Sequence, residues 1–449
     1  MHYKVALSKI FRVTIPIELI RTINPKSGEY VRIVLRKSDK VDYFYLRVPS
    51  KPPSRKEVQV RRKLPERIIQ NLQLIPNNKI LIGSISKLEI KKLDKPFVDN
   101  KFDLLFLPLE DLMIDTFIRN GEEWCRFWSS SKFGGIAKEV ELKRFIPINR
   151  ETGELFGLMQ AESRKHGEKF DFTNILISEH KKFLEVSEIL GVNKKLWKFG
   201  LIYNPSLNDK LIENYIETFS KELKIENSYI TKSNSITTVA YQIYIPSKIL
   251  NQIMNFVLQT SRKLIPEEAR YSKNRHLLDF CKGFLIKDLV GDGTVILNKD
   301  MTHLDIILSE ENLNAQEDII RMLNLFGIHS KPHKNRIDIS TNFDSLIWFL
   351  DNNLFVEHKK NREKMLRYIK HNYYFNTLYE RLEVLNSPNS INKFAQMVNL
   401  NPNSAQMYLL RNKKRGFITS SYTTKQVTYY ASEKGKHFLD LIGSLQSEN

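Results

Sequence analysis

The sequence contains very little cysteine and no long apolar segment, and each absence excludes a class of protein. Its only cysteines, Cys125 and Cys281, lie far apart and outside any CxxC pattern, so neither a disulfide framework nor a zinc finger is encoded. No apolar run approaches the ~18 residues that a membrane-spanning helix requires. The first residues, MHYKVALSKIFRV, lack the apolar region of a secretory signal peptide. We therefore expect a protein of the reducing cytoplasm, with no membrane as a partner.

Acidic residues are scarce relative to basic ones. The 449 residues include 70 Lys and Arg but only 51 Asp and Glu, which gives a formal net charge of +19. The excess is spread along the chain, as expected when several surfaces face a polyanion. Biased genome composition produces the same excess, so the charge favours a nucleic acid partner without proving it. The 41% hydrophobic residues can form folded cores, and the length is enough for about two to four domains.

The N-terminal part of the chain contains an internal repeat. One copy reads VTIPIELIRTINPKSGEYVRIVL, and the other reads RRKLPERIIQNLQLIPNNKILIGSI. Pro16 and Pro65 occupy the same place in each copy, before polar turns at Ser27-Gly28 and Asn77-Asn78. Each copy is predicted to form a strand, a short helix that begins at the proline, a turn and a second strand. Because such a unit is too short to bury its own core, the two copies should interdigitate.

This repeat resembles the AbrB-type family of swapped-hairpin DNA-binding proteins, here with both halves on one chain. A β-rich interaction module is the alternative. By composition, residues 49–54 form a linker between the copies. We assign residues 1–97 to this domain and residues 98–137 to a connecting segment. The resemblance implies DNA contacts from the basic residues that flank the strands, which are Lys9, Arg12, Arg61, Arg62 and Lys63.

From about Lys138 the pattern changes to alternating helices and strands. Apolar periodicity predicts a series of elements that ends with a helix at 247–262 and a loop at 265–273. The order partly recurs after this loop. We therefore predict an α+β fold with two αββαββα-like halves, at residues 138–264 and 265–356.

Two of the predicted helices end in an acidic residue at matched places. One reads LFGLMQAES and carries Glu162, and the other reads LIKDLVGDG and carries Asp292. Small residues four positions apart share one helix face, where they allow a second helix to pack backbone to backbone. Helices packed in this way bring Glu162 and Asp292 together at their C-terminal ends. The small residues expected to serve this packing are Gly157, Ala161, Gly291 and Gly293.

Two carboxylates at such a position repel each other and face the negative ends of two helix dipoles. A divalent cation with oxygen ligands removes this conflict, and Mg²⁺ in particular binds through a few carboxylates together with phosphate oxygens. Such a site activates water and neutralises charge on a phosphate during in-line hydrolysis. The acidic pair therefore indicates metal-assisted phosphodiester cleavage.

The segments GELFGLMQAESRK and CKGFLIKDLVGDGTV resemble the two motifs of a monomeric LAGLIDADG homing endonuclease, and RFIPINRETGELFGL resembles the start of that domain in archaeal-type members. The match covers residues 138–354. It implies a monomer with internal pseudo-twofold symmetry whose two sheets bind adjacent major grooves of double-stranded DNA, and whose cuts leave 3′ overhangs. By position it makes Glu162 and Asp292 the metal-binding acids, with Mg²⁺ as the ion, and Lys248 a candidate catalytic lysine.

Several positions depart from the family pattern. Lys287 stands where the family usually places a packing glycine, with Gly283 one turn earlier. Gln160 and Ser163 replace the commoner acid and glycine of the first motif. The second half has no lysine that corresponds to Lys248, which leaves impairment of one half open. The alternative is that the two motifs are an ordinary buried helix end and a Gly-rich turn.

The segment 357–449 begins with a charged helix and continues as helix, turn, helix, hairpin and helix. This order resembles a winged helix-turn-helix, with the wing tip at Thr423-Thr424. A helical protein-interaction domain is the alternative. The basic run Lys359–Lys370 is expected to be a solvated helix face. Base-edge contacts are expected from Ser404, Gln406 and Tyr408, and phosphate contacts from Arg411, Lys413, Lys414 and Arg415.

Two functions fit these patterns. The first is a site-specific, Mg²⁺-dependent DNA endonuclease, and the survival of both acids favours it because a pure DNA binder gains nothing from a repulsive pair. The second is a transcriptional regulator that keeps the core for docking on DNA and does not cut, which the two regulator-like modules favour. We expect the endonuclease. Assistance of RNA splicing by the same fold is a more distant alternative.

Overall fold

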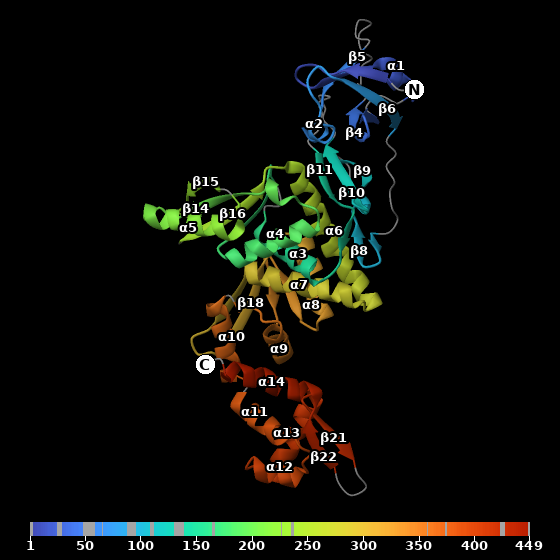
Figure 1. Cartoon of the computed structure of the whole chain (residues 1–449). Helices are drawn as coiled ribbons and strands as arrows, with labels where there is room; N and C mark the ends of the chain where they lie inside the picture. The colour runs from blue at the N-terminus through green and yellow to red at the C-terminus, as the bar shows by residue number, and fades with distance from the viewer. Residues whose placement is uncertain are drawn as a thin grey trace. The chain divides into compact units, whose positions relative to one another are not determined.

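A computed structural model of the chain (Figure 1) is α+β, with several small sheets. The predicted linker 49–54, the turn at Ser27-Gly28, Pro65 and the wing tip Thr423-Thr424 lie outside the described residues. Within the residues that the structure describes, no helix is both long and apolar enough to cross a membrane. The structure describes residues 3–24, 29–47, 59–64, 66–87, 96–107, 112–129, 139–163, 167–225, 227–234, 238–356, 358–372, 375–422 and 427–447.

The chain divides into two compact units. One consists of Met1–Pro147 with Arg164–Thr260, and the other consists of Ile148–Ser163 with Ser261–Asn449. The second unit therefore takes a short segment from the middle of the chain, and this segment holds the first of the two motif helices.

The two copies of the N-terminal repeat interdigitate, as predicted. β2 (Arg12–Pro16) of the first copy pairs antiparallel with β5 (Gln59–Lys63) of the second. β3 (Tyr30–Lys37) pairs in the same way with β6 (Lys79–Lys87). Each ladder thus takes one strand from each copy, which lets two short units bury a common core.

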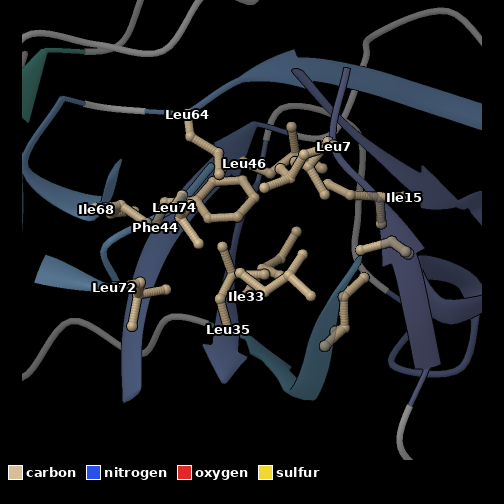
Figure 2. Packing of buried hydrophobic residues seen from close by; sticks show 14 of the residues in the cluster. Leu7, Ile15, Ile33, Leu35, Phe44, Leu46, Leu64, Ile68, Leu72 and Leu74 are labelled. Atoms are coloured by element: carbon tan, nitrogen blue, oxygen red, sulfur yellow. The ribbon is translucent and has the colours of Figure 1, made fainter. Parts of the chain in front are cut away.

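One hydrophobic core serves both copies (Figure 2). α1 (Ile17–Arg21) and α2 (Glu66–Asn71) follow the first strand of their copies, as the repeat predicts. Two strands that lie outside the repeat, β1 (Tyr3–Ala6) and β4 (Lys40–Arg47), complete a sheet in the order β1-β6-β3-β4. The fully buried side chains of this core include Val13, Ile15, Val31, Ile33, Leu35, Phe44 and Ile68.

Residues 98–137, expected to connect two domains, contain most of a folded sheet. β9 (Leu112–Arg119), β10 (Glu122–Ser129) and β11 (Glu139–Lys143) form an antiparallel sheet in the order β11-β10-β9. The composition of this segment did not show that it pairs with residues further along the chain. A second small sheet joins β7 (Phe97–Val98), β8 (Lys101–Asp103) and β12 (Phe145–Pro147).

β4 contacts this connecting sheet through aromatic and cationic side chains. The ring of Tyr45 stacks on that of Trp128, with centroids 3.8 Å apart. The guanidinium of Arg126 lies 4.4 Å from the ring centroid of Tyr43, and it also pairs with Glu141 at 2.8 Å. The N-terminal domain is therefore in direct contact, through β4, with the sheet that follows it.

The first predicted half departs from the αββαββα order. A helix, α4 (Ile177–Ile189), stands between β13 (Phe170–Asn174) and β14 (Lys198–Tyr203). The sheet has the order β13-β16-β14-β15, in which β15 (Asn227–Lys232) is parallel to β14 and β16 (Val239–Ile245) is central. α4 and α5 provide the crossover connections that such pairing requires. α5 spans Asp209–Leu223.

The loop predicted at 265–273 is wrong, because α6 (Lys248–Ser272) continues through Pro266. A proline in a helix interior costs about 3 kcal/mol. Ile265 and Ala269, on either side of it, are buried, so apolar burial offsets this cost. A rule that ends a helix at proline does not take this burial into account.

The second half follows the predicted αββαββα order. It opens with α7 (Arg275–Asp292), and its sheet is antiparallel throughout, in the order β17-β18-β20-β19. The remaining elements are β17 (Gly293–Leu297), β18 (Leu304–Ser309), α8 (Leu313–Leu325), β19 (Ser330–His333), β20 (Arg336–Ile339) and α9 (Phe343–Asp351).

The C-terminal segment has the predicted order of helices and hairpin. Its first helix, α10 (Lys359–Asn372), buries Met365 and Ile369, and Lys364 donates a hydrogen bond of 2.8 Å to the carbonyl of Val295. The basic run therefore lies on a helix with an apolar underside. The elements that follow are α11 (Phe375–Val384), α12 (Ile391–Met397), α13 (Pro402–Lys414), β21 (Ile418–Tyr422), β22 (Val427–Ala431) and α14 (Glu433–Ser447).

His180, on α4, is buried between two carbonyl groups. Its Nδ1 lies 2.8 Å from the oxygen of Leu176, and its Nε2 lies 3.0 Å from the oxygen of Tyr241. Burial lowers the pKa of His180 from 6.5 to about 4, although both contacts favour the protonated ring. The neutral ring carries one N–H, so it donates to only one of these carbonyls.

We expect His180 to make the free energy of unfolding depend on pH in mild acid. Because its pKa is lower in the folded chain, the unfolded chain binds the proton first, and stability falls as the pH drops from about 6.5 towards about 4, by up to about 3 kcal/mol. His180→Gln should remove this slope in urea unfolding experiments, whereas His276→Gln, at an exposed position, should keep it. A slope that persists in His180→Gln would contradict the assignment.

Candidate active site and nucleic-acid interface

α3 (Arg150–Glu162) and α7 pack side by side in the second unit (Figure 1). Glycines bring their backbones into contact. A Cβ at Gly157 would lie 2.3 Å from the carbonyl oxygen of Phe284, and a Cβ at Gly283 would lie 2.4 Å from that of Arg150. Both distances are far shorter than atoms allow, so no larger residue fits at these two positions without displacing a helix. The close crossing expected from the small residues is present.

The helix contacts repeat with a constant shift in residue number. A Cβ at Gly153 would lie 2.1 Å from the carbonyl oxygen of Phe280. This contact is the counterpart of the one between Gly283 and the carbonyl oxygen of Arg150. The shift is the same for both members of the contact (283 − 153 = 280 − 150). Gly283 is therefore the equivalent of Gly153, and Lys287 is the equivalent of Gly157. The two helices are related as a pseudo-twofold pair, and they run in the same direction because their contacts advance together.

The same shift makes Glu162 equivalent to Asp292 and Ala161 equivalent to Gly291. A Cβ at Gly291 would lie 2.4 Å from the Cβ of Ala161 and 3.7 Å from Oε1 of Glu162. α3 ends at Glu162 and α7 ends at Asp292, so each acid is the last residue of its helix. Both acids are half-buried. The structure thus places the two carboxylate-bearing residues at one end of a tightly packed helix pair.

Gly293, expected in the helix contact, has a different role. It is the C-cap of α7, and its N–H donates to the carbonyl of Leu289. A Cβ at Gly293 would meet this carbonyl of its own helix at 2.0 Å, and the three atoms nearest to it all belong to Leu289. Ser163 caps α3 in the equivalent place, with its N–H donating to Met159.

Lys248, the candidate catalytic lysine, begins α6. Its side chain is exposed, and its Nζ lies 3.5 Å from a carboxylate oxygen of Glu168. It belongs to the first compact unit, whereas both acids belong to the second. Its role therefore stays a prediction.

A buried polar network holds the last turn of α3. Gln160 donates a hydrogen bond to Glu310, and its Oε1 accepts one of 2.6 Å from Arg262. Arg262 also pairs with Asp318 at 3.1 Å, and Asp318 in turn pairs with Arg321. The first four of these side chains are buried. Gln160 thus serves as an anchor two residues before Glu162.

Replacing Arg262 by Met should lower the free energy of unfolding of the second unit by about 3 kcal/mol. The substitution removes one partner of a buried ion pair, and Arg321 compensates Asp318 only in part. Urea unfolding measures the change. Arg275→Met, at an exposed i,i+4 pair with Asp279, is the matched control and should cost less than about 1 kcal/mol. Equal effects at the two positions would contradict this account of the network.

The acidic pair supplies only two protein ligands for a metal ion. Among the residues that the structure describes, no three His, Cys, Asp or Glu side chains are grouped as a metal site. Mg²⁺ fits a site of this kind, because it is commonly held by one or two carboxylates and completes its coordination with water and substrate phosphates. The donors at this helix end are therefore suitable for an ion that binds together with a phosphodiester.

The β2–β5 ladder brings the N-terminal basic positions together. Arg12 lies opposite Lys63 in the ladder, and it is exposed, as is Lys9 in the turn before β2. The pairing of the two copies therefore collects basic residues that are far apart in the sequence. Three side chains lie outside the part that the structure describes, those of Arg61, Arg62 and Lys63.

α13 begins at the predicted cap. The side chain of Asn401 accepts a hydrogen bond of 2.8 Å from the N–H of Ser404, and Pro402 opens the helix. An isolated bridge between Asn389 and Tyr429 joins the hairpin to the chain before α12. The exposed polar residues of α13 and its end include Ser404, Gln406, Arg411, Lys414 and Arg415, whereas Lys413 donates to Ser420 at 2.6 Å.

Tyr408 does not lie where the prediction placed it. Its ring stacks on Phe394, with centroids 5.9 Å apart, and the guanidinium of Arg381 lies 4.7 Å from its centroid. Burial raises the pKa of Tyr408 to about 12. It is half-buried, one turn from the buried Ala405 and Asn412, and its ring packs against other helices of the module, which does not favour the predicted contact with base edges.

Sequence reasoning missed two residues on the opposite face of α13. Met407 is 64% exposed and Leu410 is 46% exposed. The signal was available, because both lie half a turn away from the apolar stripe that includes Ala405 and Leu409.

No family model matches this chain, and a search of curated proteins gave no significant similarity.

Proposed function

We propose that this chain is a site-specific double-stranded DNA endonuclease of the LAGLIDADG homing type that hydrolyses phosphodiester bonds with Mg²⁺. One observation carries the proposal, namely the glycine-mediated contact between two equivalent helices that end in Glu162 and Asp292. An ordinary buried helix pair has no need for an acid as the last residue of each helix, because at this shared end the acids repel each other and the helix dipoles.

The residues of the chain have distinct tasks in this proposal. Glu162 and Asp292 hold the ion, and the glycine contacts fix the separation of the helices that carry them. When bound, Mg²⁺ stabilises the charge that develops on the phosphate during hydrolysis. The negative ends of α3 and α7 favour a cation at this place. Lys248 is proposed to assist the reaction of one strand.

The outer modules are proposed to supply further DNA contacts. The N-terminal repeat is proposed to be an AbrB-type DNA-binding fold, and its β2–β5 ladder collects basic positions. The C-terminal module is proposed to be a winged helix-turn-helix that docks α13 in a groove. Because both acids are on one chain, the protein is proposed to act as a monomer. Salt-sensitive binding to duplex DNA is the expected property of all these surfaces.

A cleavage assay tests the proposal. The full chain is incubated with a library of random genomic fragments in plasmids, with Mg²⁺ or with a chelator, and the new ends are sequenced. The proposal is supported by cuts at one recurrent sequence that need Mg²⁺. Binding of duplex DNA without any cut in the library would contradict the proposal.

A regulator that binds DNA without cutting it is the second candidate. The sheet of residues 138–264 favours this candidate, because its strand order differs from that of the sheet of residues 265–356. The pseudo-twofold symmetry of α3 and α7 therefore does not extend to the sheets. The second half also has no lysine near Thr341 and Asn342, the place that corresponds to Lys248. The same assay separates the two functions, because a regulator binds duplex DNA and leaves the library intact.

A further inference from the structure

The outward face of α13 is apolar at its centre. Ala405, Leu409 and Asn412 face the core of the module. At 3.6 residues per turn, the opposite stripe consists of Asn403, Met407, Leu410 and Lys414. Met407 and Leu410 are neighbours on this stripe, and both side chains are exposed. An adjacent pair of exposed apolar side chains favours a partner with apolar groups.

The charges around this stripe favour a polyanion as the partner. No Asp or Glu occurs between Val384 and Ser432, a stretch that includes α12, α13 and the hairpin. Arg411, Lys414 and Arg415 are exposed at the C-terminal end of α13. A protein partner with an apolar surface does not require a module free of carboxylates, whereas phosphates do favour one.

Two kinds of exposed side chain in the first turns of α13 match the groups that A·T pairs present in the major groove. Asn403 and Gln406 have amide groups, which pair with N6 and N7 of adenine. Met407 and Leu410 are apolar, and the apolar group at a base edge in the major groove is the thymine methyl. From Pro402 to Leu410 there is no Arg or Lys, the residues that contact guanine most often.

We infer that α13 reads A·T-rich duplex DNA in the major groove, with Met407 and Leu410 in contact with thymine methyl groups. The inference rests on the proposed duplex binding by this module and does not depend on cleavage. Cleavage without a preference for the thymine methyl removes this inference alone. The preference without cleavage removes the endonuclease alone.

Replacing thymine by uracil in the DNA tests the inference, because it removes the methyl group and leaves base pairing intact. The probes are labelled alternating A–T and A–U duplexes of about 30 base pairs, long enough for several modules. The dissociation constants of the full chain are measured by fluorescence anisotropy at one salt concentration. We expect binding to the A–U duplex to be weaker by at least about fourfold, the value for one buried methyl group.

The double variant Met407→Ala/Leu410→Ala should bind the two duplexes equally. Leu313→Ala, which alters an exposed leucine on α8 that is 63% accessible, is the matched control and should keep the wild-type ratio. Equal binding of both duplexes by the wild type would overturn the inference and leave a protein as the partner of this face. An undiminished preference in the double variant would also overturn it, because another surface would then read the methyl groups.

Discussion

Replacing Glu162 by Gln, or Asp292 by Asn, should abolish Mg²⁺-dependent cleavage and leave duplex binding intact. Each substitution removes one of two charged ligands of the proposed ion and changes little in shape. Stabilisation by a metal ion is worth several kcal/mol at the transition state, so a loss of at least about a hundredfold in rate is expected. The cleavage rate is measured on the site recovered from the library, at saturating protein.

Two other acids on the same helices serve as controls. Glu151→Gln alters an exposed acid in the first turn of α3, and Asp279→Asn alters one near the start of α7. Both are far along the helices from the acidic ends, and both should cut at the wild-type rate. A full rate in Glu162→Gln, or equal losses in the controls, would contradict the assignment of the acidic pair.

The glycine contact predicts the second large effect, which concerns stability. Gly→Ala in an exposed helix stabilises by about 1 kcal/mol. Gly157→Ala should instead destabilise the second unit by about 3 kcal/mol, because the new Cβ would lie 2.3 Å from the carbonyl oxygen of Phe284. Urea unfolding of the full chain measures the change. A gain in stability would show that α3 and α7 do not touch at this position.

A pair of substitutions tests the same contact at the acidic end. Gly291→Ala alone should destabilise, because its Cβ would lie 2.4 Å from the Cβ of Ala161. The double variant Ala161→Gly/Gly291→Ala moves the methyl group to the other helix, and it should recover stability to within about 1 kcal/mol of the wild type, since the helix propensities cancel. Destabilisation that simply adds in the double variant would contradict the face-to-face placement.

The helix contact was predictable because its signal is local. The amino-acid sequence alone shows small residues four positions apart on one helix and an acid at the end of each of two helices. The residues that contact each other across the two helices were not predictable. The role of Gly153 and Gly283 appears only when the two helices are aligned in space. The pattern also assigned Gly293 to the contact, whereas its own helix end requires it.

The sheets were less predictable, because strand pairing joins residues that are distant in the sequence. The strands of the first half were found, but their order and the parallel pairing of β14 with β15 were not. In the same way, the burial of Tyr408 depends on Phe394 and Arg381 from other helices. The spacing of apolar residues along the sequence shows which side of α13 faces the core. It does not show that a large side chain next to this side also reaches the core.

Binding of Mn²⁺, a paramagnetic substitute for Mg²⁺, tests most directly whether one cation is shared by two helix ends. Electron paramagnetic resonance of the complex with duplex DNA should detect an ion that Mg²⁺ displaces. If this ion needs both carboxylates, Glu162→Gln and Asp292→Asn should each weaken its binding by about tenfold or more. Unchanged Mn²⁺ affinity in either single variant would contradict the shared site, and with it the endonuclease.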